Sequence, residues 1–197
     1  MDSYITIDNI AEGLYKEKGS KFLAFAYHVR TTDEIKEILD TLRKEHHDAR
    51  HVCYAYMLGP EKKDFRAADD SEPSGTAGRP ILGAILSSGA TDILIAVVRY
   101  FGGTKLGTSG LINAYKTASQ DAMEHAVLVE KTVDAEITFS FEYVMMNDVM
   151  KVIKDLNPNV ISQSFDNDCV MTLSIRKGEF DRLKDRLLKI DRLRVDE

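Results

Sequence analysis

The sequence has no long apolar run and only two cysteines, and both absences narrow the class of protein. Its apolar stretches are far too short to cross a bilayer, and its first residues lack the basic and apolar regions of a signal peptide. Cys53 and Cys169 match no CxxC or metal-binding spacing. We therefore expect a cytoplasmic protein with two reduced, buried thiols, no disulfide and no cysteine metal centre.

The sequence also lacks an excess of positive charge. Of its 197 residues, 26 are lysine or arginine and 32 are aspartate or glutamate, so the net charge is −6. This balance disfavours binding of nucleic acid by the whole surface. The window 78–120 is an exception, because its four basic residues outnumber its single acid, Asp92. The window predicts a local basic patch.

Hydrophobic patterning predicts the elements of the first part of the chain. Apolar and β-branched runs indicate strands, and apolar residues at helical spacing indicate helices. The predicted strands are residues 21–30, 52–58 and 93–99. The predicted helices are 33–46, capped by Thr31, and one capped by Thr108 or Ser109; residues 80–87 are ambiguous and could open a short helix. Residues 59–78 are polar and turn-rich, which predicts a long loop.

A seam near residues 129–133 precedes a second pattern. Its predicted elements are a strand at 135–141, a helix at 145–156, a hairpin of 160–165 and 169–176 joined by residues 166–168, a helix at 179–188 and an edge strand at 192–195. That order is βαββαβ, the ferredoxin-like plan. We therefore predict an α+β protein with two domains, residues 1–130 and 133–197.

Two glycine-rich loops indicate a functional site. They are DDSEPSGTAGRP at residues 69–80 and RYFGGTKLGTSG at 99–110, and both mix glycine with charged and hydroxyl side chains. Glycine lets a backbone take positive φ and approach a ligand closely, whereas a core needs neither charge nor so many glycines. We hypothesise that the two loops meet and form one concave surface.

The second loop has the chemistry of an anion site. It lies between a predicted strand and a predicted helix, whose N-terminus offers free N–H groups and the positive end of the dipole. Lys105 adds a point charge and Arg99 a bidentate fork. The spacing fits neither GxxxxGK[ST] nor GxGxxG, so no nucleotide is predicted. The alternative is a glycine-rich turn that only packs strand against helix.

The acids of the first loop have two interpretations. Asp69, Asp70 and Glu72 are three carboxylates in four positions, which could hold Mg²⁺ or pair with arginine. No further ligand shows metal-site spacing, so we expect Asp70 and Glu72 to orient Arg79 or Arg99 and expect no metal.

Catalytic signals are weak. Ser74 and Thr76 lack a GxSxG elbow, which makes hydrogen bonding a better interpretation than nucleophilic attack. His51 is a further candidate, either as a general base or as a turn residue. The sequence has no recognisable catalytic motif and requires no cofactor.

At these motifs the sequence resembles the IMPACT family, in its bacterial two-domain YigZ-type branch. The matching text is KGSKFLA at 18–24, DARHVCYAY at 48–56, DDSEPSGTAGRPIL at 69–82 and VVRYFGGTKLGTSGL at 97–111. The resemblance implies a first domain with the ribosomal protein S five domain 2-like fold and a second like elongation factor G domain V. It also implies glycine at positions 71 and 109, where this chain has serine.

The resemblance also implies a function. Eukaryotic relatives act in translational control through protein contacts, and the bacterial branch has no established reaction. We therefore predict a translation-associated regulatory protein that contacts RNA, the ribosome or a translation factor, with no membrane partner. The alternatives are an enzyme acting on a phosphorylated or anionic small molecule and a pure protein-interaction module. The predicted ligand-binding residues are Asp69, Asp70, Glu72, Ser74, Thr76, Arg79, Arg99, Gly102, Gly103, Lys105, Gly107 and Thr108.

Overall fold

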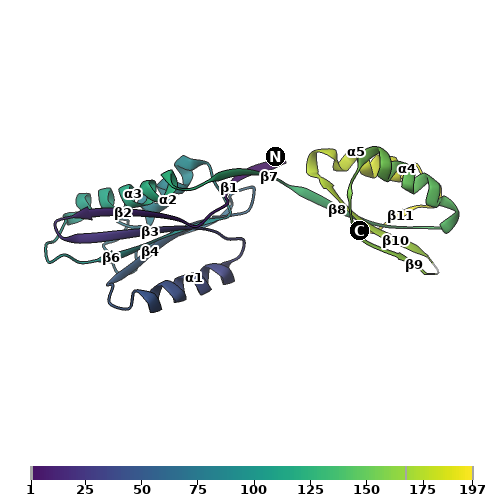
Figure 1. Cartoon of the computed structure of the whole chain (residues 1–197). Helices are drawn as coiled ribbons and strands as arrows, with labels where there is room; N and C mark the ends of the chain where they lie inside the picture. The colour runs from purple at the N-terminus through teal and green to yellow at the C-terminus, as the bar shows by residue number, and fades with distance from the viewer. Residues whose placement is uncertain (1, 167, 197) are drawn as a thin grey trace. The chain divides into compact units, whose positions relative to one another are not determined.

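The structure is a computed structural model that describes residues 2–166 and 168–196. It divides the chain into two compact units, each a mixed α/β fold (Figure 1). One unit is Tyr4–Lys131, and the other combines the described residues before Tyr4 with the chain from Thr132 onward. None of the helices within the described ranges is long and apolar enough to span a membrane.

The first unit is built on a five-stranded antiparallel sheet. Its strands, in sheet order, are β2 (Ala11–Glu17), β3 (Ser20–His28), β6 (Ile93–Tyr100), β4 (His51–Leu58) and β5 (Asp64–Ala68). The central strand β6 is buried on both faces from Ile93 to Arg99. Burial on both faces explains why this segment is continuously apolar and does not alternate, as the sequence indicates.

Helices cover both faces of this sheet (Figure 1). Helix α1 (Thr32–Glu45) lies on one face, and α2 (Gly78–Ser88) and α3 (Gly107–Glu124) pack together on the other. Strand β3 shows the reason, because Phe22 belongs to the core beneath α2 and α3 while its neighbour Leu23 packs on the α1 side. Apolar residues on both faces of a strand require a cover on each.

Helix α1 begins as predicted. Thr31 lies in extended backbone, and its side chain accepts a hydrogen bond from the backbone N–H of Glu34. Ile35, Leu39 and Leu42 then form one buried stripe, as their spacing predicts. The helix is therefore local in origin, with a cap worth about 1 kcal/mol.

Four strands differ from the sequence prediction. β1 (Ser3–Ile7) and β7 (Leu128–Thr132) form a two-stranded sheet, so the predicted seam at 129–133 is a strand. β5 lies inside the predicted loop of residues 59–78, and β2 carries no apolar run. Gly13 in β2 is explained only by the tertiary structure, since a Cβ there would lie 2.3 Å from the Ala122 nitrogen of α3.

The second unit has the βαββαβ element order that the sequence predicts. The elements are β8 (Asp134–Phe141), a 3-10 turn η1 (Tyr143–Met145), α4 (Met146–Leu156), β9 (Asn159–Phe165), β10 (Cys169–Arg176), α5 (Lys177–Leu187) and β11 (Arg194–Val195). The sheet order is β11-β8-β10-β9, and all neighbours are antiparallel. Asn167, in the predicted turn of the hairpin, lies outside the described residues.

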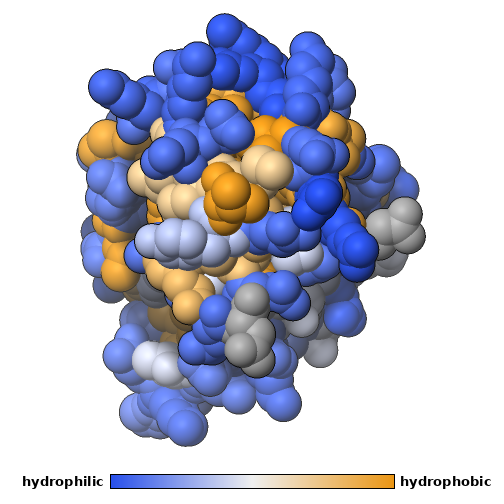
Figure 2. Space-filling view, turned by 90° about the vertical axis from the view of Figure 1, so that its right-hand side faces the viewer, coloured by the Kyte–Doolittle hydropathy of each residue, from blue (hydrophilic) through white to orange (hydrophobic). Residues whose placement is uncertain are grey.

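A local signal accounts for the end of helix α4 in this unit. α4 ends at Asn157, which takes a left-handed conformation with φ of 50° just before Pro158. Phe139, Leu173 and Leu183 form the centre of the core. Figure 2 shows apolar side chains gathered within a hydrophilic surround on the side of the molecule that faces the viewer.

Candidate functional site

The two glycine-rich loops meet in space, as the sequence predicts. They line a cavity of about 540 Å³, which we call the loop cavity. The loop cavity is lined by Arg50, His51, Glu72, Pro73, Arg99, Phe101, Lys105, Leu106, Gly107, Thr108 and Leu111. It therefore draws on the start of β4, the loop before α2, the end of β6 and the start of α3.

A buried ion pair forms the base of the loop cavity. Arg99 and Glu72 are only 5% and 8% exposed. Arg99 Nη1 donates to Glu72 Oε1 at 2.5 Å, and the Tyr115 hydroxyl donates to the same oxygen at 2.7 Å. A buried carboxylate is stable only when it is paired and hydrogen-bonded. Glu72 therefore orients Arg99, which confirms that part of the sequence prediction.

The Arg99 guanidinium has hydrogen-bonding capacity beyond its pair with Glu72. It lies 5.5 Å from the ring centre of Phe22 and 5.7 Å from that of Phe101. Its Nε is buried and has no hydrogen-bond partner among the described residues. Most buried donors in proteins are satisfied, so a buried donor without a partner calls for an explanation. An anion bound beside Arg99 would supply one.

Cys53 and Tyr115 extend the buried network behind Glu72. The Cys53 thiol donates to the Asp69 carbonyl at 3.0 Å, and its sulfur lies 3.4 Å from the Tyr115 hydroxyl. Burial raises the pKa of both the Cys53 thiol and the Tyr115 phenol. Both groups therefore stay protonated and act as donors. Cys53 and Cys169 are free and buried, as the sequence predicts.

Asp69 holds the backbone of the first glycine-rich loop. Its carboxylate accepts hydrogen bonds from the backbone N–H groups of Gly75, Ala77 and Gly78 at 2.8–3.1 Å. Burial opposes ionisation, but these three donors outweigh it and lower the pKa of Asp69. Asp69 thereby shapes the entry to α2 and does not line the loop cavity.

Asp70 fastens the same loop to strand β4. Its carboxylate accepts from the backbone N–H of Val52 at 2.7 Å, instead of orienting an arginine as the sequence analysis expects. The Asp70 carbonyl lies 2.7 Å from His51 Nδ1, which places the proton of a neutral imidazole on that nitrogen. The other nitrogen, Nε2, lies 3.8 Å from Glu72 Oε1. His51 is thus held in a fixed orientation at the wall of the loop cavity.

The start of α3 forms the opposite wall. The helix begins at Gly107 with Leu106 as its N-cap, and no side chain caps it. Thr108 and Ser109, the predicted caps, lie in its first turn. Uncapped N–H groups and the positive end of the dipole favour an anion at this position. Gly107 has a φ of 73°, which favours glycine where the chain turns into the helix.

Other predicted residues lie outside the loop cavity. Thr76 is buried and donates to the Pro73 carbonyl at 2.6 Å, while Ser74 and Arg79 are exposed. Gly102 is required by packing, because a Cβ there would lie 2.0 Å from the Gly19 carbonyl carbon. Gly103 turns the chain with a φ of 91°. Of the predicted residues, the loop cavity is lined by His51, Glu72, Arg99, Lys105, Gly107 and Thr108.

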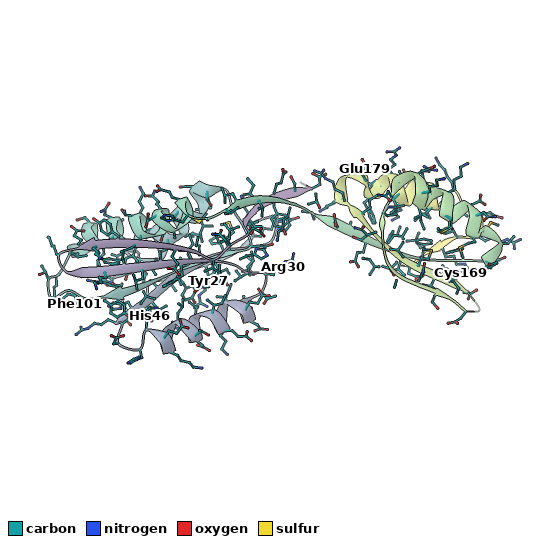
Figure 3. All side chains as sticks on the ribbon, viewed as in Figure 1. Tyr27, Arg30, His46, Phe101, Cys169 and Glu179 are labelled. Atoms are coloured by element: carbon teal, nitrogen blue, oxygen red, sulfur yellow. The ribbon has the colours of Figure 1, made fainter. Side chains whose placement is uncertain are left out.

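Arg50 and Phe101 were not predicted as site residues. Phe101 is 40% exposed, and the Arg50 guanidinium lies 5.5 Å from its ring centre. Figure 3 places Phe101 at one end of the first unit. The sequence signal for Arg50 was its position beside His51 in the DARHVCYAY motif. Its approach to residue 101 depends on the sheet, which brings the start of β4 beside the end of β6.

Together these features define a two-domain α/β protein with a basic cavity at one end of its first domain. The sequence-family model of the Impact N-terminal domain matches residues 18–123, which include every residue of the loop cavity. The chain belongs to the IMPACT family.

Curated relatives and a solved structure agree with this membership. The IMPACT family member YigZ of Escherichia coli is 33% identical over 150 residues, which cover 75% of this chain and 74% of that protein. YvyE of Bacillus subtilis is 32% identical over 155 residues, covering 79% and 71%. A crystal structure described as a hypothetical protein matches with a TM-score of 0.77 and 28% identity, over 99% of this chain and 97% of that one.

Proposed function

We propose that this protein is a translation-associated regulatory binding protein that contacts RNA, alone or within the ribosome, through the loop cavity. The observation that carries the proposal is the combination of Arg50, Arg99 and Lys105 with the uncapped start of α3 around one cavity. Cations and free backbone N–H groups bind phosphate oxygens without reading a base. Membership of the IMPACT family supports the link with translation, and a translation factor is an alternative partner.

The buried and the exposed cations of the loop cavity have different roles. Arg99 is held by Glu72, so its charge is partly compensated before any ligand arrives. Arg50 and Lys105 are exposed and contribute charge that is free to meet an incoming phosphate. We therefore assign most of the ligand affinity to Arg50 and Lys105, and a positioning role to Arg99.

Co-sedimentation with ribosomes at low and high salt tests the proposal. The variant Arg50→Ala/Lys105→Ala removes the two exposed cations, and Lys44→Ala/Lys116→Ala is the control with the same change of charge. Each lost charge-assisted contact weakens binding by about tenfold. Loss of ribosome binding in the first variant but not in the control supports the proposal. Unchanged binding in both, with the same salt dependence, contradicts it.

A second candidate is binding of an anionic small molecule, with or without its chemical conversion. The size of the loop cavity favours it, because about 540 Å³ lies within the range of small-molecule sites. Thermal unfolding in inorganic phosphate and in nucleoside monophosphates tests it. A ligand of the folded state raises the midpoint increasingly as its concentration exceeds its Kd, and the Arg50→Ala/Lys105→Ala variant would lose that rise.

We also propose that residues 1–130 and 133–197 are separate domains, the first with the ribosomal protein S five domain 2-like fold and the second ferredoxin-like. In the second unit the strand order is fourth, first, third, second, which supports the ferredoxin-like assignment. A fragment ending at residue 132 keeps β7 whole. Cooperative unfolding of that fragment supports the division, and an unfolded product contradicts it.

A further inference from the structure

Two smaller cavities continue the loop cavity across the first domain. One, of about 370 Å³, lies between α1 and the strands β4 and β5. It is lined by Thr32, Ile35, Lys36, Leu39, Asp40, Arg43, Tyr54, Tyr56 and Arg66. The other, of about 230 Å³, lies at the end of α1 and is lined by Arg43, His46, His47, Ala49, Arg50, Val52 and Asp70.

Shared residues join the three cavities into one path. Arg43 lines both the cavity beside α1 and the cavity at its end, and Arg50 lines both that cavity and the loop cavity. Figure 3 places His46 and Phe101, which line successive cavities, at the same end of the domain. We call the combined lining of the three cavities the basic track.

The charge of the basic track is opposite to that of the chain. It holds six lysines and arginines and three acids, in a protein with a net charge of −6. Two of the acids are already engaged, because Asp70 accepts from the Val52 N–H and Glu72 holds Arg99. The third, Asp40, lies on α1 between Lys36 and Arg43. An anionic ligand therefore meets excess positive charge along the whole path.

Helical spacing explains why the cations line one side of α1. Lys36 and Arg43 are seven residues apart and so lie on the same face, beside the buried stripe of Ile35, Leu39 and Leu42. Arg66 faces this helix from β5, where it pairs with Tyr56 of β4. Both α1 cations are exposed, so they can reach a ligand without disturbing the core.

We propose that the basic track is the path of a single-stranded RNA, which runs from the loop cavity past Arg50 and Arg43 toward Lys36 and Arg66. This inference rests on the proposed function and names the rest of its interface. Cations in each cavity match the repeated phosphates of a strand. Half-buried Tyr54 and exposed Phe101 offer aromatic surface near either end, the pattern typical of grooves that hold single strands.

RNA binding by a track variant tests the inference. Lys36→Gln/Arg43→Gln/Arg66→Gln removes the cations beyond the loop cavity, and Lys16→Gln/Lys44→Gln/Lys116→Gln is the control. Each phosphate contact contributes about 0.7 to the log–log salt slope for a single strand, so the track variant should lose about 2 units. On an oligonucleotide of about 20 nucleotides, that loss weakens binding about 100-fold at about 0.1 M salt. The control should bind like the wild type.

A second test of the inference varies the length of the oligonucleotide. A dinucleotide has a single internucleotide phosphate and is too short to extend from the loop cavity along α1, so the track variant should bind it as the wild type does. Cross-linking of 4-thiouridine RNA to the unmodified protein should map to Tyr54 as well as to Phe101. This measurement uses no variant and is independent of any effect of substitution on folding.

The outcomes separate the inference from the proposed function. If the wild type binds no RNA, both fail. If Arg50→Ala/Lys105→Ala abolishes RNA binding but the track variant binds long RNA normally, the proposed function holds and the track is wrong. If polyglutamate binds with the same dependence on the track residues and RNA does not, the occupant is an acidic peptide and the RNA assignment is overturned.

Discussion

The first domain contains a buried ion pair, whereas pairs of the second domain lie on the surface. In the first, Arg99 and Glu72 are buried at the base of a cavity and share a network with Tyr115. In the second, pairs such as Arg186 with Asp155 and Arg182 with Glu179 lie on the surface. A surface pair contributes little, because water screens it, whereas breaking a buried pair leaves an uncompensated charge. Location therefore matters more than the presence of the pair.

This contrast predicts a large difference between two arginine substitutions. Arg99→Met leaves the Glu72 carboxylate buried without its cation and should lower the free energy of unfolding by about 3–5 kcal/mol. Arg186→Met removes the half-buried partner of a pair at the surface and should leave the denaturation midpoint almost unchanged. Urea unfolding of the two variants measures the difference. Equal midpoints would show that the buried pair contributes no more to stability than the surface pair.

A second contrast lies between two glycines of the first domain. Gly13→Ala drives a Cβ to within 2.3 Å of the α3 backbone at Ala122, so a strand or a helix must shift. We expect a loss of about 3 kcal/mol. Gly83, exposed in α2, has open space around it, so Gly83→Ala should gain about 0.5–1 kcal/mol from helix propensity. Thermal unfolding compares the two signs, and a stabilised Gly13→Ala variant would refute the close packing of β2 on α3.

The acid sensitivity of the first loop follows from Asp69. Its pKa is lowered in the folded protein, so its contribution to stability is present above its unfolded pKa of about 4 and is lost as pH falls through the lower folded value. Asp69→Asn should cost about 2 kcal/mol near neutral pH and progressively less below about pH 4. Denaturant unfolding at several pH values measures this difference. A difference independent of pH would mean that the carboxylate charge is not what holds the loop.

The smallest expected effect concerns Ser71, where the resemblance implies glycine. Ser71 has a φ of 70°, in the left-handed region that favours glycine, and its side chain is exposed. Ser71→Gly should therefore raise the free energy of unfolding by about 1 kcal/mol. Ser109 lies in the first turn of α3, so Ser109→Gly should instead lower stability slightly. The same sign for both substitutions would show that loop strain does not distinguish the two positions.

Much of the fold could be predicted because its signals are local. The continuous apolar run of β6, the Thr31 cap of α1 and the stop at Asn157 and Pro158 each depend on a few adjacent residues. Strands β1, β2, β5 and β7 were not predicted, because they lack such local signals. β5 is an exposed edge strand without an apolar pattern, and Gly13 makes sense only against α3.

The loop cavity was predicted in outline and misjudged in detail. The mixture of glycine and charge identified both loops, and Lys105, Arg99 and Glu72 do line the cavity between them. Asp69 and Asp70 belong to the same motif but serve the backbone of their own loop. Asp69, Asp70 and Glu72 all carry a carboxylate, so residue type and spacing cannot separate a group that lines the cavity from a structural one.

By itself, the sequence determined the helices and central strands, the βαββαβ order of the second unit and the two loops that line the loop cavity. These follow from patterns within about ten to twenty residues, where propensity, capping and periodicity act. Only the tertiary structure decided which charges are used internally, and only it placed Arg50 in the loop cavity and Arg43 in the two smaller cavities. The reason is physical: such roles depend on distances between segments far apart in the chain, and those distances are set by the packing of helices on the sheet.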